Sequence, residues 1–321
     1  MPSDLFSTAS IIREPAASQP GYWAGAPCAY YDAPEQTWYL TYRIRRPRGV
    51  TPDRGGEARI ARSKDLRTWE DIWSVTKDQF GSASIERCAL RKGADGSWRY
   101  YASYVDPTDN RWCVSQMTAR EIAALDPKHA KPVFKGQPLG LEGIKDPWIY
   151  ADADEFHMLL SVAIPTPKTT TGSHSTADIF NTGECISAAG LAVSNDLDHW
   201  DWKGIVSKPD STGWDRYCRR LNSAVPVGGK LLGFYDGSAG HHENYEEKCG
   251  LAISTNWLDW KSLTPKEPAF SSPNSSKSLR YVDAQVVGEE VYIFFEFARS
   301  DGSHDLRFTR AGVKSIAALS R

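Results

Sequence analysis

The sequence predicts an all-β protein, a five-bladed β-propeller whose four-stranded antiparallel blades surround a central axial pocket. Three observations support this prediction. The 321 residues include 12 Trp, 14 Tyr and 11 Phe but only 3 Met, a balance typical of β-rich proteins. A short motif recurs along the chain, and a pair of strand-like runs precedes each copy. Repeated units of this kind are typical of propellers, in which each unit forms one blade.

The recurring motif is a short β-type run that ends in Ser and is followed by a polar turn and Trp. Its three plainest copies read ARSKDLRTW at 61–69, AVSNDLDHW at 192–200 and AISTNWLDW at 252–260. Two weaker copies are WCVSQMT at 112–118 and LRFTRAG at 306–312. Five units result when one hydroxyl residue of each copy is aligned: Ser63, Ser115, Ser194, Ser254 and Thr309.

Two strand-like runs joined by a turn precede each copy. They read CAYYDAPEQTWYLTYRI, CALRKGADGSWRYYASYV, WIYADADEFHMLLSV, AVPVGGKLLGFYDG and AQVVGEEVYIFFEFA. Their turns carry Asp, Gly, Pro and Glu, as hairpin turns do. We therefore expect inner strands to begin near residues 27, 87, 147, 223 and 284, and residues 1–321 to form one domain.

Two segments depart from this pattern. TAREIAALDP at 118–127 predicts a helix, with Thr118 as its N-cap and Glu121 at the third helical position. The irregular stretch at 164–185 lies inside the third unit. We expect it to form a long loop over one face, and insertions of that size are usually functional or disordered.

Charge and composition exclude several classes of protein. The net charge is −2, with 38 basic and 40 acidic side chains, which argues against a nucleic-acid-binding protein. No apolar run approaches the roughly 18 residues of a membrane helix, and MPSDLFSTASIIREP does not resemble a secretory signal. The six cysteines are scattered singly, without a CxxC pair. We expect a cytoplasmic protein with no membrane or nucleic-acid partner.

The starts of the five inner strands point to the axis of a propeller. They read GAPCAYY at 25–31, ERCALR at 86–91, KDPWIY at 145–150, LNSAVPV at 221–227 and VDAQVV at 282–287. Their alignment places these residues around one pocket: Ala26, Glu86, Asp146, Asn222 and Asp283. Asp and Asn also occur there as ordinary turn residues, but three converging acids need compensating charge.

Basic residues flank these acids in the sequence. They are Arg87, Lys145, Arg219, Arg220 and Arg280. Alternating acids and bases hold pKa values apart, as acid–base catalysis requires, or they form structural salt bridges between blades. If the arginines exceed what the acids need, an anionic sugar becomes a candidate ligand, because Arg pairs well with carboxylates.

Further candidates for the pocket lie elsewhere in the fourth and fifth units. FYDGSAGHHENYEEKCGLA at 234–252 is either a solvated turn or a source of site residues. It supplies Asp236, His241, His242, Glu243 and Glu246, and the fifth unit adds Glu296. Aromatic rings pack on sugar faces, and we expect Trp23, Trp214 and Tyr281 to do so here. Trp69, Trp200 and Trp260 recur at the motif ends, so we assign them to blade packing.

Five units, the SxDLxxW ending and KDPWIY at 145–150 together resemble the five-bladed glycosidases of families 32, 43, 68, 117 and 130. The resemblance implies that Asp146 tunes the pKa of a catalytic acid and orients it. Two positions depart from the families: Ala26 stands where their Asp base does, and Asn222 stands where their Glu acid does. We therefore expect the catalytic groups among Asp146, Glu86, Asp283, His242 and Glu243.

The sequence thus predicts a glycoside hydrolase-like enzyme that cleaves a small oligosaccharide or glycoside by a carboxylate acid–base mechanism. The alternatives are a non-catalytic carbohydrate-binding propeller and a glycoside phosphorylase. Two carboxyl groups ~5–10 Å apart across a pocket would favour hydrolysis, whereas acids each buried in an Arg bridge would favour a binding scaffold. No cofactor is expected. The resemblance allows an axial cation such as calcium, but no residue pattern specifies a metal site.

Overall fold

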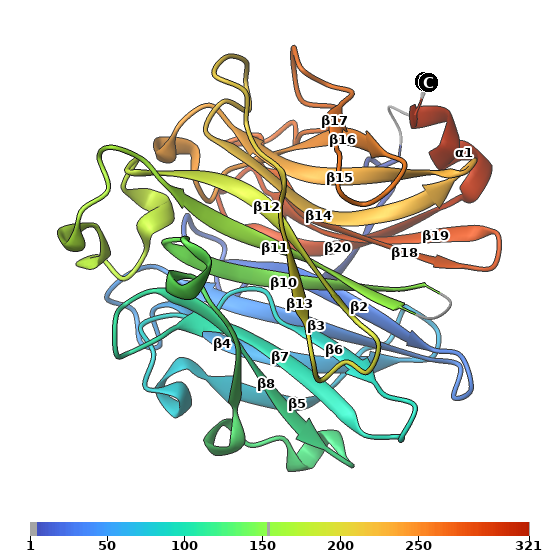
Figure 1. The fold of residues 1–321 in the computed structure, drawn as a ribbon. Helices are drawn as coiled ribbons and strands as arrows, with labels where there is room; N and C mark the ends of the chain where they lie inside the picture. Colours follow the sequence, from blue (N-terminus) through green and yellow to red (C-terminus); the bar gives the residue numbers. More distant parts are fainter. Residues whose placement is uncertain (1–4, 153–154, 321) are drawn as a thin grey trace.

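The computed structural model describes residues 5–152 and 155–320. Its strands form five groups of antiparallel strands, named blades 1 to 5 below (Figure 1). Blade 1 contains β2 (Trp23–Asp32), β3 (Thr37–Arg46), β4 (Arg54–Ser63) and β5 (Glu70–Thr76). Blade 2 contains β6 (Ala89–Lys92), β7 (Trp98–Val105), β8 (Trp112–Ala119) and β9 (Lys131–Lys135). Blade 3 contains β10 (Gly143–Asp152), β11 (Glu155–Pro165), β12 (Cys185–Ser194) and β13 (Asp201–Ser207).

Blade 4 contains β14 (Cys218–Val227), β15 (Lys230–Ser238), β16 (Lys248–Ser254) and β17 (Lys261–Ser262). Blade 5 contains β18 (Leu279–Val287), β19 (Glu290–Ala298) and β20 (His304–Gly312), and its fourth strand is β1 (Ser10–Arg13). Strands from the two ends of the chain therefore share one blade, which closes the ring. A short helix, α1 (Val313–Ala317), follows β20.

Single parallel pairings also join neighbouring blades. Trp23 on β2 pairs with His304 on β20, and Ser187 on β12 pairs with Cys218 on β14. The buried apolar clusters combine strands from adjacent blades. All six cysteines are buried and free. In the described part of the chain, no helix is long and apolar enough to cross a bilayer.

The inner strands share an irregularity near the axis. The pairing register of β2, β10, β14 and β18 shifts at Gly25/Cys28, Lys145/Trp148, Leu221/Ser223 and Arg280/Asp283. Three residues in these bulges have positive φ: Ala26 at 51°, Asp146 at 58° and Tyr281 at 52°. Bulges re-aim side chains and are common near functional sites. The register also corrects the predicted alignment, because Tyr281, not Asp283, occupies the position of Asp146.

The predicted repeat is one recurring turn. In blade 3, the Ser194 hydroxyl accepts a hydrogen bond from the Leu197 N–H at 2.9 Å, and Leu197 has a φ of 67°. The indole N–H of Trp200 then donates to the Leu197 carbonyl at 3.2 Å. The indoles of Trp69 and Trp260 donate to the equivalent carbonyls in blades 1 and 4. These three tryptophans therefore pack the blades, as predicted.

Three local predictions need correction. The segment 118–127 does not form the predicted helix, because Thr118 and Ala119 still belong to β8; the 3₁₀ turn η2 (Ile122–Ala124) follows, and a second, η3 (Pro127–His129), begins at its last residue. The register places Ala119 and Ala311 opposite Trp98 and Val291, as Ser63 lies opposite Trp38. Ser115 and Thr309 are therefore not the equivalents of Ser63. Finally, β2, β10, β14 and β18 begin earlier than expected, and β6 begins later.

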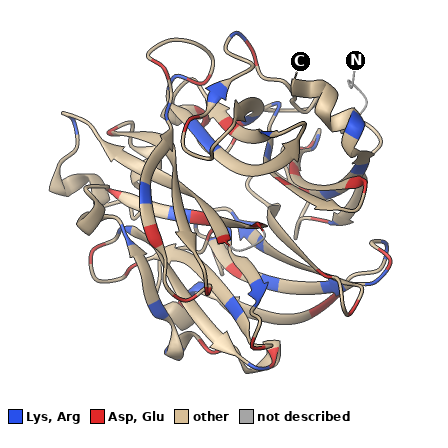
Figure 2. Ribbon diagram, turned by 45° about the vertical axis from the view of Figure 1, so that its right-hand side comes forward, with Lys and Arg blue, Asp and Glu red and all other residues tan. Residues whose placement is uncertain are grey.

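The irregular stretch at 164–185 forms a loop with two 3₁₀ turns, η5 (Thr171–His174) and η6 (Ile179–Asn181). Ile179 and Phe180 are buried against Trp112 and Cys185. This packing fixes the loop over the end of the propeller where the inner strands begin, and it positions Asp178 there. Charged residues of both signs are spread over the fold, with several of each near its centre (Figure 2).

Candidate active site at the propeller axis

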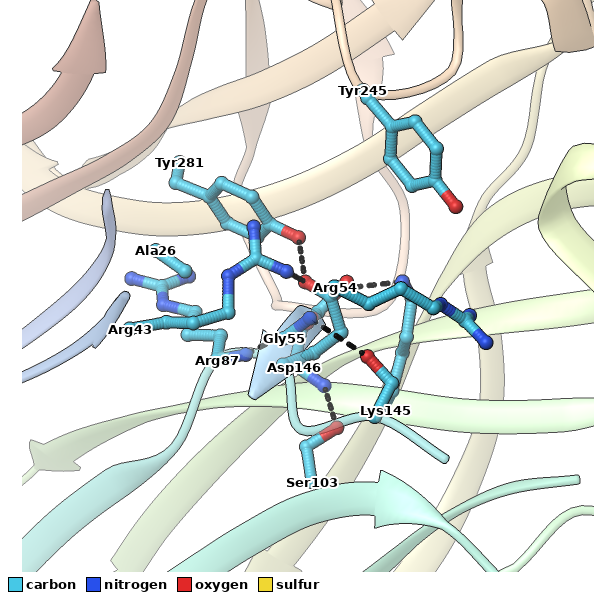
Figure 3. A network of polar contacts seen from close by, with 12 residues as sticks. Ala26, Arg43, Arg54, Gly55, Arg87, Ser103, Lys145, Asp146, Tyr245 and Tyr281 are labelled. Atoms are coloured by element: carbon cyan, nitrogen blue, oxygen red, sulfur yellow. Dashed lines mark hydrogen bonds and ion pairs between the residues drawn. The ribbon is translucent and has the colours of Figure 1, made fainter. Parts of the chain in front are cut away.

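Charged side chains from all five blades converge where the inner strands begin. Figure 3 shows Arg43 of blade 1, Lys145 and Asp146 of blade 3 and Tyr281 of blade 5 pointing toward one another, whereas Tyr245 lies apart from them. These side chains are almost entirely buried, with Asp146 and Tyr281 each 2% exposed. Ionised groups are buried only at a high cost in free energy unless they are paired. The contacts of this axial cluster therefore decide what it can do.

An unbroken series of ion pairs starts at Glu86. Its carboxylate contacts Arg43 and accepts a hydrogen bond from the Tyr281 hydroxyl at 2.9 Å. Arg43 also lies 4.0 Å from Glu296, and Glu296 accepts hydrogen bonds from Arg280 at 2.7 and 2.9 Å. Burial opposes ionisation of Glu86, but Arg43 and its other basic neighbours hold its pKa well below the usual range. Glu86 is therefore unsuited to proton donation at neutral pH.

The series continues into blade 4. Arg280 donates to Glu247 at 2.8 Å, and Glu247 also contacts Arg220. Arg220 in turn lies 3.8 Å from Oδ2 of Asp236. Burial opposes ionisation of Glu247, but the two arginines lower its pKa to about 2. Both guanidinium groups are thus engaged by a carboxylate that is ionised at neutral pH, which leaves little compensation for Asp236.

Asp236 is the member of the cluster best suited to hold a proton. Its Oδ1 accepts hydrogen bonds from the Asn222 side-chain amide at 2.6 Å and from the Tyr281 N–H at 3.0 Å. Its Oδ2 makes no hydrogen bond to any described residue. Burial, helped by the negative charge of Glu247 and opposed by Arg220, raises the pKa of Asp236 to about 7. A carboxyl with these properties is matched to general acid catalysis near neutral pH.

Asp146 also keeps one oxygen free. Its Oδ1 accepts a hydrogen bond from the Arg87 N–H at 3.3 Å, and its own N–H donates to the Ser103 hydroxyl at 3.2 Å. Its Oδ2 lies 3.8 Å from Lys145 Nζ but has no hydrogen-bond partner among the described residues. The positive φ of Asp146 aims the carboxylate at the axis from the bulge of β10.

Asp283, in contrast, is fully engaged. It accepts hydrogen bonds from the Trp148 indole at 2.6 Å, the Gln285 amide at 2.7 Å and the Ala29 N–H at 2.5 Å. Arg87 lies 3.8 Å away and donates to the carbonyls of Pro27 and Asn222, both at 2.8 Å. These contacts connect several blades. They correspond to the structural salt-bridge alternative for Asp283 and Arg87.

Aromatic rings and a histidine border the cluster. Trp23 stacks on His304 with ring centroids 4.5 Å apart, and the Arg45 guanidinium lies 3.9 Å from the Trp23 ring. His304 contacts Glu296 at 2.8 Å and Glu246 at 3.1 Å. Burial disfavours its charged form, but the two carboxylates raise its pKa. Trp23 thus lies beside the axial cluster, and its contact with a sugar stays a prediction.

Most of the predicted site residues lie within this network. They are Trp23, Glu86, Arg87, Lys145, Asp146, Arg220, Asn222, Asp236, Arg280, Tyr281, Asp283 and Glu296. Other candidates make their contacts elsewhere. His241, His242 and Glu243 form the 3₁₀ turn η7, and the His242 side chain is 69% exposed. Their catalytic or binding roles stay predictions.

Trp214 and Arg219 also make their contacts away from the axial cluster. Trp214 stacks on Tyr235, and its indole donates to the Thr264 carbonyl at 2.7 Å. Arg219 pairs with Asp215 at 2.8 Å and with Asp210 at 2.9 Å. These contacts are typical of blade packing, so substrate binding by Trp214 and Arg219 stays a prediction.

Sequence reasoning missed several residues that lie in the cluster or beside it. These are Arg43, Arg45, Asp178, Tyr245, Glu247 and His304. Arg43 and Arg45 did carry a signal, since they interrupt TWYLTYRIRR, a run otherwise expected to be buried. Asp178 carried none, because only the fold of its loop brings it to Tyr245 and Arg54. Among the described residues, no group of His, Cys, Asp or Glu is arranged to hold a metal ion.

Comparison with known proteins supports the fold. No family model and no curated protein sequence matches this chain significantly. A thermostable family-43 glycoside hydrolase is similar in structure. The alignment covers 90% of this chain and 89% of that protein's chain, at 13% sequence identity and a TM-score of 0.62. For a family-32 β-fructofuranosidase from Bombyx mori, the alignment covers 89% of this chain and 59% of that protein's chain, at 14% sequence identity and a TM-score of 0.62.

For a β-1,2-mannobiose phosphorylase from Listeria innocua, the alignment covers 96% of this chain and 94% of that protein's chain, at 11% sequence identity and a TM-score of 0.62. Likeness at such low identity concerns the fold alone. The chain therefore has the five-bladed propeller fold of glycoside hydrolases and glycoside phosphorylases. The predicted resemblance and fold class are confirmed.

Proposed function

We propose that this protein cleaves a glycosidic bond of a small carbohydrate at the axial cluster, with Asp236 as the proton donor. The observation that carries the proposal is that two carboxylates of the axial cluster, Asp146 and Asp236, each keep an Oδ2 atom without a hydrogen-bond partner among the described residues. An unpaired buried polar atom costs about 1–3 kcal/mol. In a catalytic site, atoms of this kind would be the ones that contact the reacting group.

The residues divide the chemistry between them. Asp236 is protonated below its pKa of about 7 and donates that proton to the leaving glycosidic oxygen. The Asp146 carboxylate stabilises the positive charge that develops on the sugar ring, while a water molecule bonds to the anomeric carbon in place of the leaving group and releases a proton to solvent. Glu247 and Arg220 support the donor, because the carboxylate of Glu247 raises the pKa of Asp236 while Arg220 opposes it. The pKa values of the carboxyl groups of Asp236 and Glu247 are thus held apart, as acid–base catalysis requires.

A non-catalytic carbohydrate-binding propeller is the second candidate. Two observations favour it: Ala26 and Asn222 occupy positions where the resembling families carry acids, and Glu86, Glu247 and Glu296 are each paired with arginine. Under this alternative, a sugar hydroxyl would occupy the place near Asp146 and Asp236. The two candidates differ in whether a bound glycoside is cleaved.

A substrate screen tests the proposal. Wild type, Asp146→Asn and Asp236→Asn are assayed against aryl glycosides and small oligosaccharides, with Asp305→Asn as the matched control. Asp305 is also buried, but Arg307 on the same strand pairs with it at 2.7 and 3.0 Å. We expect wild type and control to cleave a common substrate and both site variants to lose at least about 100-fold in kcat.

Two results would contradict the proposal in different ways. Binding of several sugars by wild type without cleavage of any would establish the non-catalytic alternative. Cleavage that persists in both Asp146→Asn and Asp236→Asn would show that the reaction occurs elsewhere in the protein.

A further inference from the structure

Arg45 is a buried cation without a counter-ion. Its side chain is 9% exposed, yet it makes no hydrogen bond or ion pair with any described residue. Its guanidinium instead lies 3.9 Å from the ring of Trp23 and 4.4 Å from the ring of Tyr245. The two aromatic faces fix the guanidinium, but ring faces do not accept its N–H groups as a carboxylate would.

The surroundings of Arg45 increase its need for an anion. Arg43 and Arg45 alternate with the core residue Ile44 along β3, so both project from the same face of the strand. None of the Arg43 guanidinium nitrogens makes a hydrogen bond among the described residues, although Arg43 is in ion contact with Glu86. Burial lowers the pKa of Arg45 to about 10; Tyr245 and the carboxylate of Glu86 oppose this shift, and the positive charges of Arg43 and Arg280 add to it.

A further unpaired donor lies at the same place. Trp23 and Arg45 are directly opposite on β2 and β3, and the indole N–H of Trp23 is buried without a hydrogen-bond partner. Tyr245 is held across from them, since its hydroxyl contacts Asp178 and Asn181. Two donors without a hydrogen-bond partner among the described residues, one of them charged, therefore lie beside the axial cluster.

We infer that the ligand of the axial site carries an oxyanion, and that Arg45 binds it with help from the Trp23 indole. This inference rests on the proposed function and names its substrate class, an acidic glycoside. A sugar carboxylate can accept two parallel hydrogen bonds from a planar guanidinium, in bidentate geometry. Free inorganic phosphate offers the same chemistry, so the experiment separates the two sources.

Titration calorimetry at low salt tests the inference with D-galacturonate, D-glucuronate, D-galactose, D-glucose and inorganic phosphate as probes. The proteins are wild type, Arg45→Gln, Arg45→Lys and the control Arg62→Gln, which removes an arginine that is 51% exposed and paired with Glu70. Circular dichroism confirms that each variant is folded. We expect wild type and Arg62→Gln to bind at least one uronate at least tenfold more tightly than its neutral counterpart. Arg45→Gln should abolish that preference, and Arg45→Lys should restore it in part.

Each outcome decides the inference. Arg45-dependent binding of phosphate but not of uronates supports an oxyanion site and indicates that the anion is a phosphate co-substrate. Equal binding of uronates and neutral sugars, an Arg45→Gln variant indistinguishable from wild type, or no anion binding overturns it. Arg45-dependent uronate binding without cleavage of any glycoside supports the inference and contradicts the proposed function. Cleavage of neutral glycosides that Arg45→Gln leaves unchanged supports the proposed function and overturns the inference.

Discussion

At the residue scale, a few side chains separate a reactive cluster from a purely structural one. Asp146 and Asp236 each retain a free oxygen, whereas Asp283 uses both of its oxygens to bind other blades. Asp146 could be predicted, because KDPWIY at 145–150 resembles a family motif. The role proposed for Asp236 could not, because its raised pKa depends on burial and on Glu247, which only the fold brings close.

The pH dependence of cleavage tests the role of Asp236. We expect kcat of wild type to fall as the pH rises through about 7, because the carboxyl must be protonated to donate its proton and burial raises its pKa to about 7. Glu86 and Glu247 stay ionised throughout this range and do not reproduce the fall, because their pKa values are lowered. A kcat profile that is flat between pH 5 and 9 would exclude Asp236 as the donor at about this pKa.

Gly25 is a second residue on which the cluster depends. A Cβ at Gly25 would lie 1.8 Å from the Glu296 carboxylate, which also accepts a hydrogen bond from the Ala26 N–H at 3.1 Å. We expect Gly25→Ala to lower the free energy of unfolding by about 2–4 kcal/mol, since the buried carboxylate must move away from its partners. Urea denaturation measures this loss.

The control for Gly25→Ala is Gly172→Ala. There the nearest atom to an added Cβ is the Thr170 hydroxyl at 3.6 Å, an ordinary contact distance. Stability of Gly172→Ala should stay within about 0.5 kcal/mol of wild type. Equal effects of the two substitutions would show that the clash with Glu296 does not limit stability.

At the element scale, periodicity in the sequence predicts the blades but not the geometry of their inner strands. The Ser–turn–Trp motif predicted blades 1, 3 and 4 because its hydrogen bonds are local. In blades 2 and 5, Ala119 and Ala311 replace the Ser, so the turn left no signal there. The bulges at Ala26, Asp146 and Tyr281 depend on pairing with a second strand, which no single run of residues reveals.

Closure of the ring by β1 yields a prediction about Arg13. This residue pairs with Leu306 on β20, and its side chain donates to the Tyr42 hydroxyl at 3.1 Å and to Asp71 at 2.9 Å. It therefore ties blade 5 to blade 1. Arg13→Gln should lower the free energy of unfolding by about 1–3 kcal/mol. Arg62→Gln, which removes an exposed pair, should change it by less than about 1 kcal/mol. Equal losses of unfolding free energy in the two variants, measured by chemical denaturation, would exclude a role for Arg13 in closing the ring of blades.

At the scale of the whole molecule, the buried axial charges link stability to pH. The pKa of Asp236 is raised from an ordinary value near 4 to about 7, so the folded state binds its proton more tightly than the unfolded state. Its contribution to stability is complete below about pH 4 and is lost as the pH rises to about 7. The pKa of Glu296 is lowered to about 2, because Arg280 and His304 outweigh burial, and its contribution is lost in acid.

Comparison of wild type with Asp236→Asn isolates the contribution of Asp236. Between about pH 4 and 7, we expect the wild type to lose up to about 1.4 kcal/mol of unfolding free energy per pH unit relative to the variant. If Asp236→Asn is inactive but gains stability relative to wild type as the pH rises to 7, then Asp236 serves function at a cost in stability. Parallel stability curves would contradict the raised pKa of Asp236.

The most direct measurement of the central claim is a crystal structure of Asp236→Asn with an uncleaved oligosaccharide from the substrate screen. We predict that the sugar lies at the axis beside Trp23, with the scissile oxygen ~2.6–3.2 Å from the side chain at position 236. The contradicting result is a sugar seated between outer strands instead, for example in the cavity of about 810 Å³ lined by Ile205, Arg219 and Trp260, with the axial cluster unchanged.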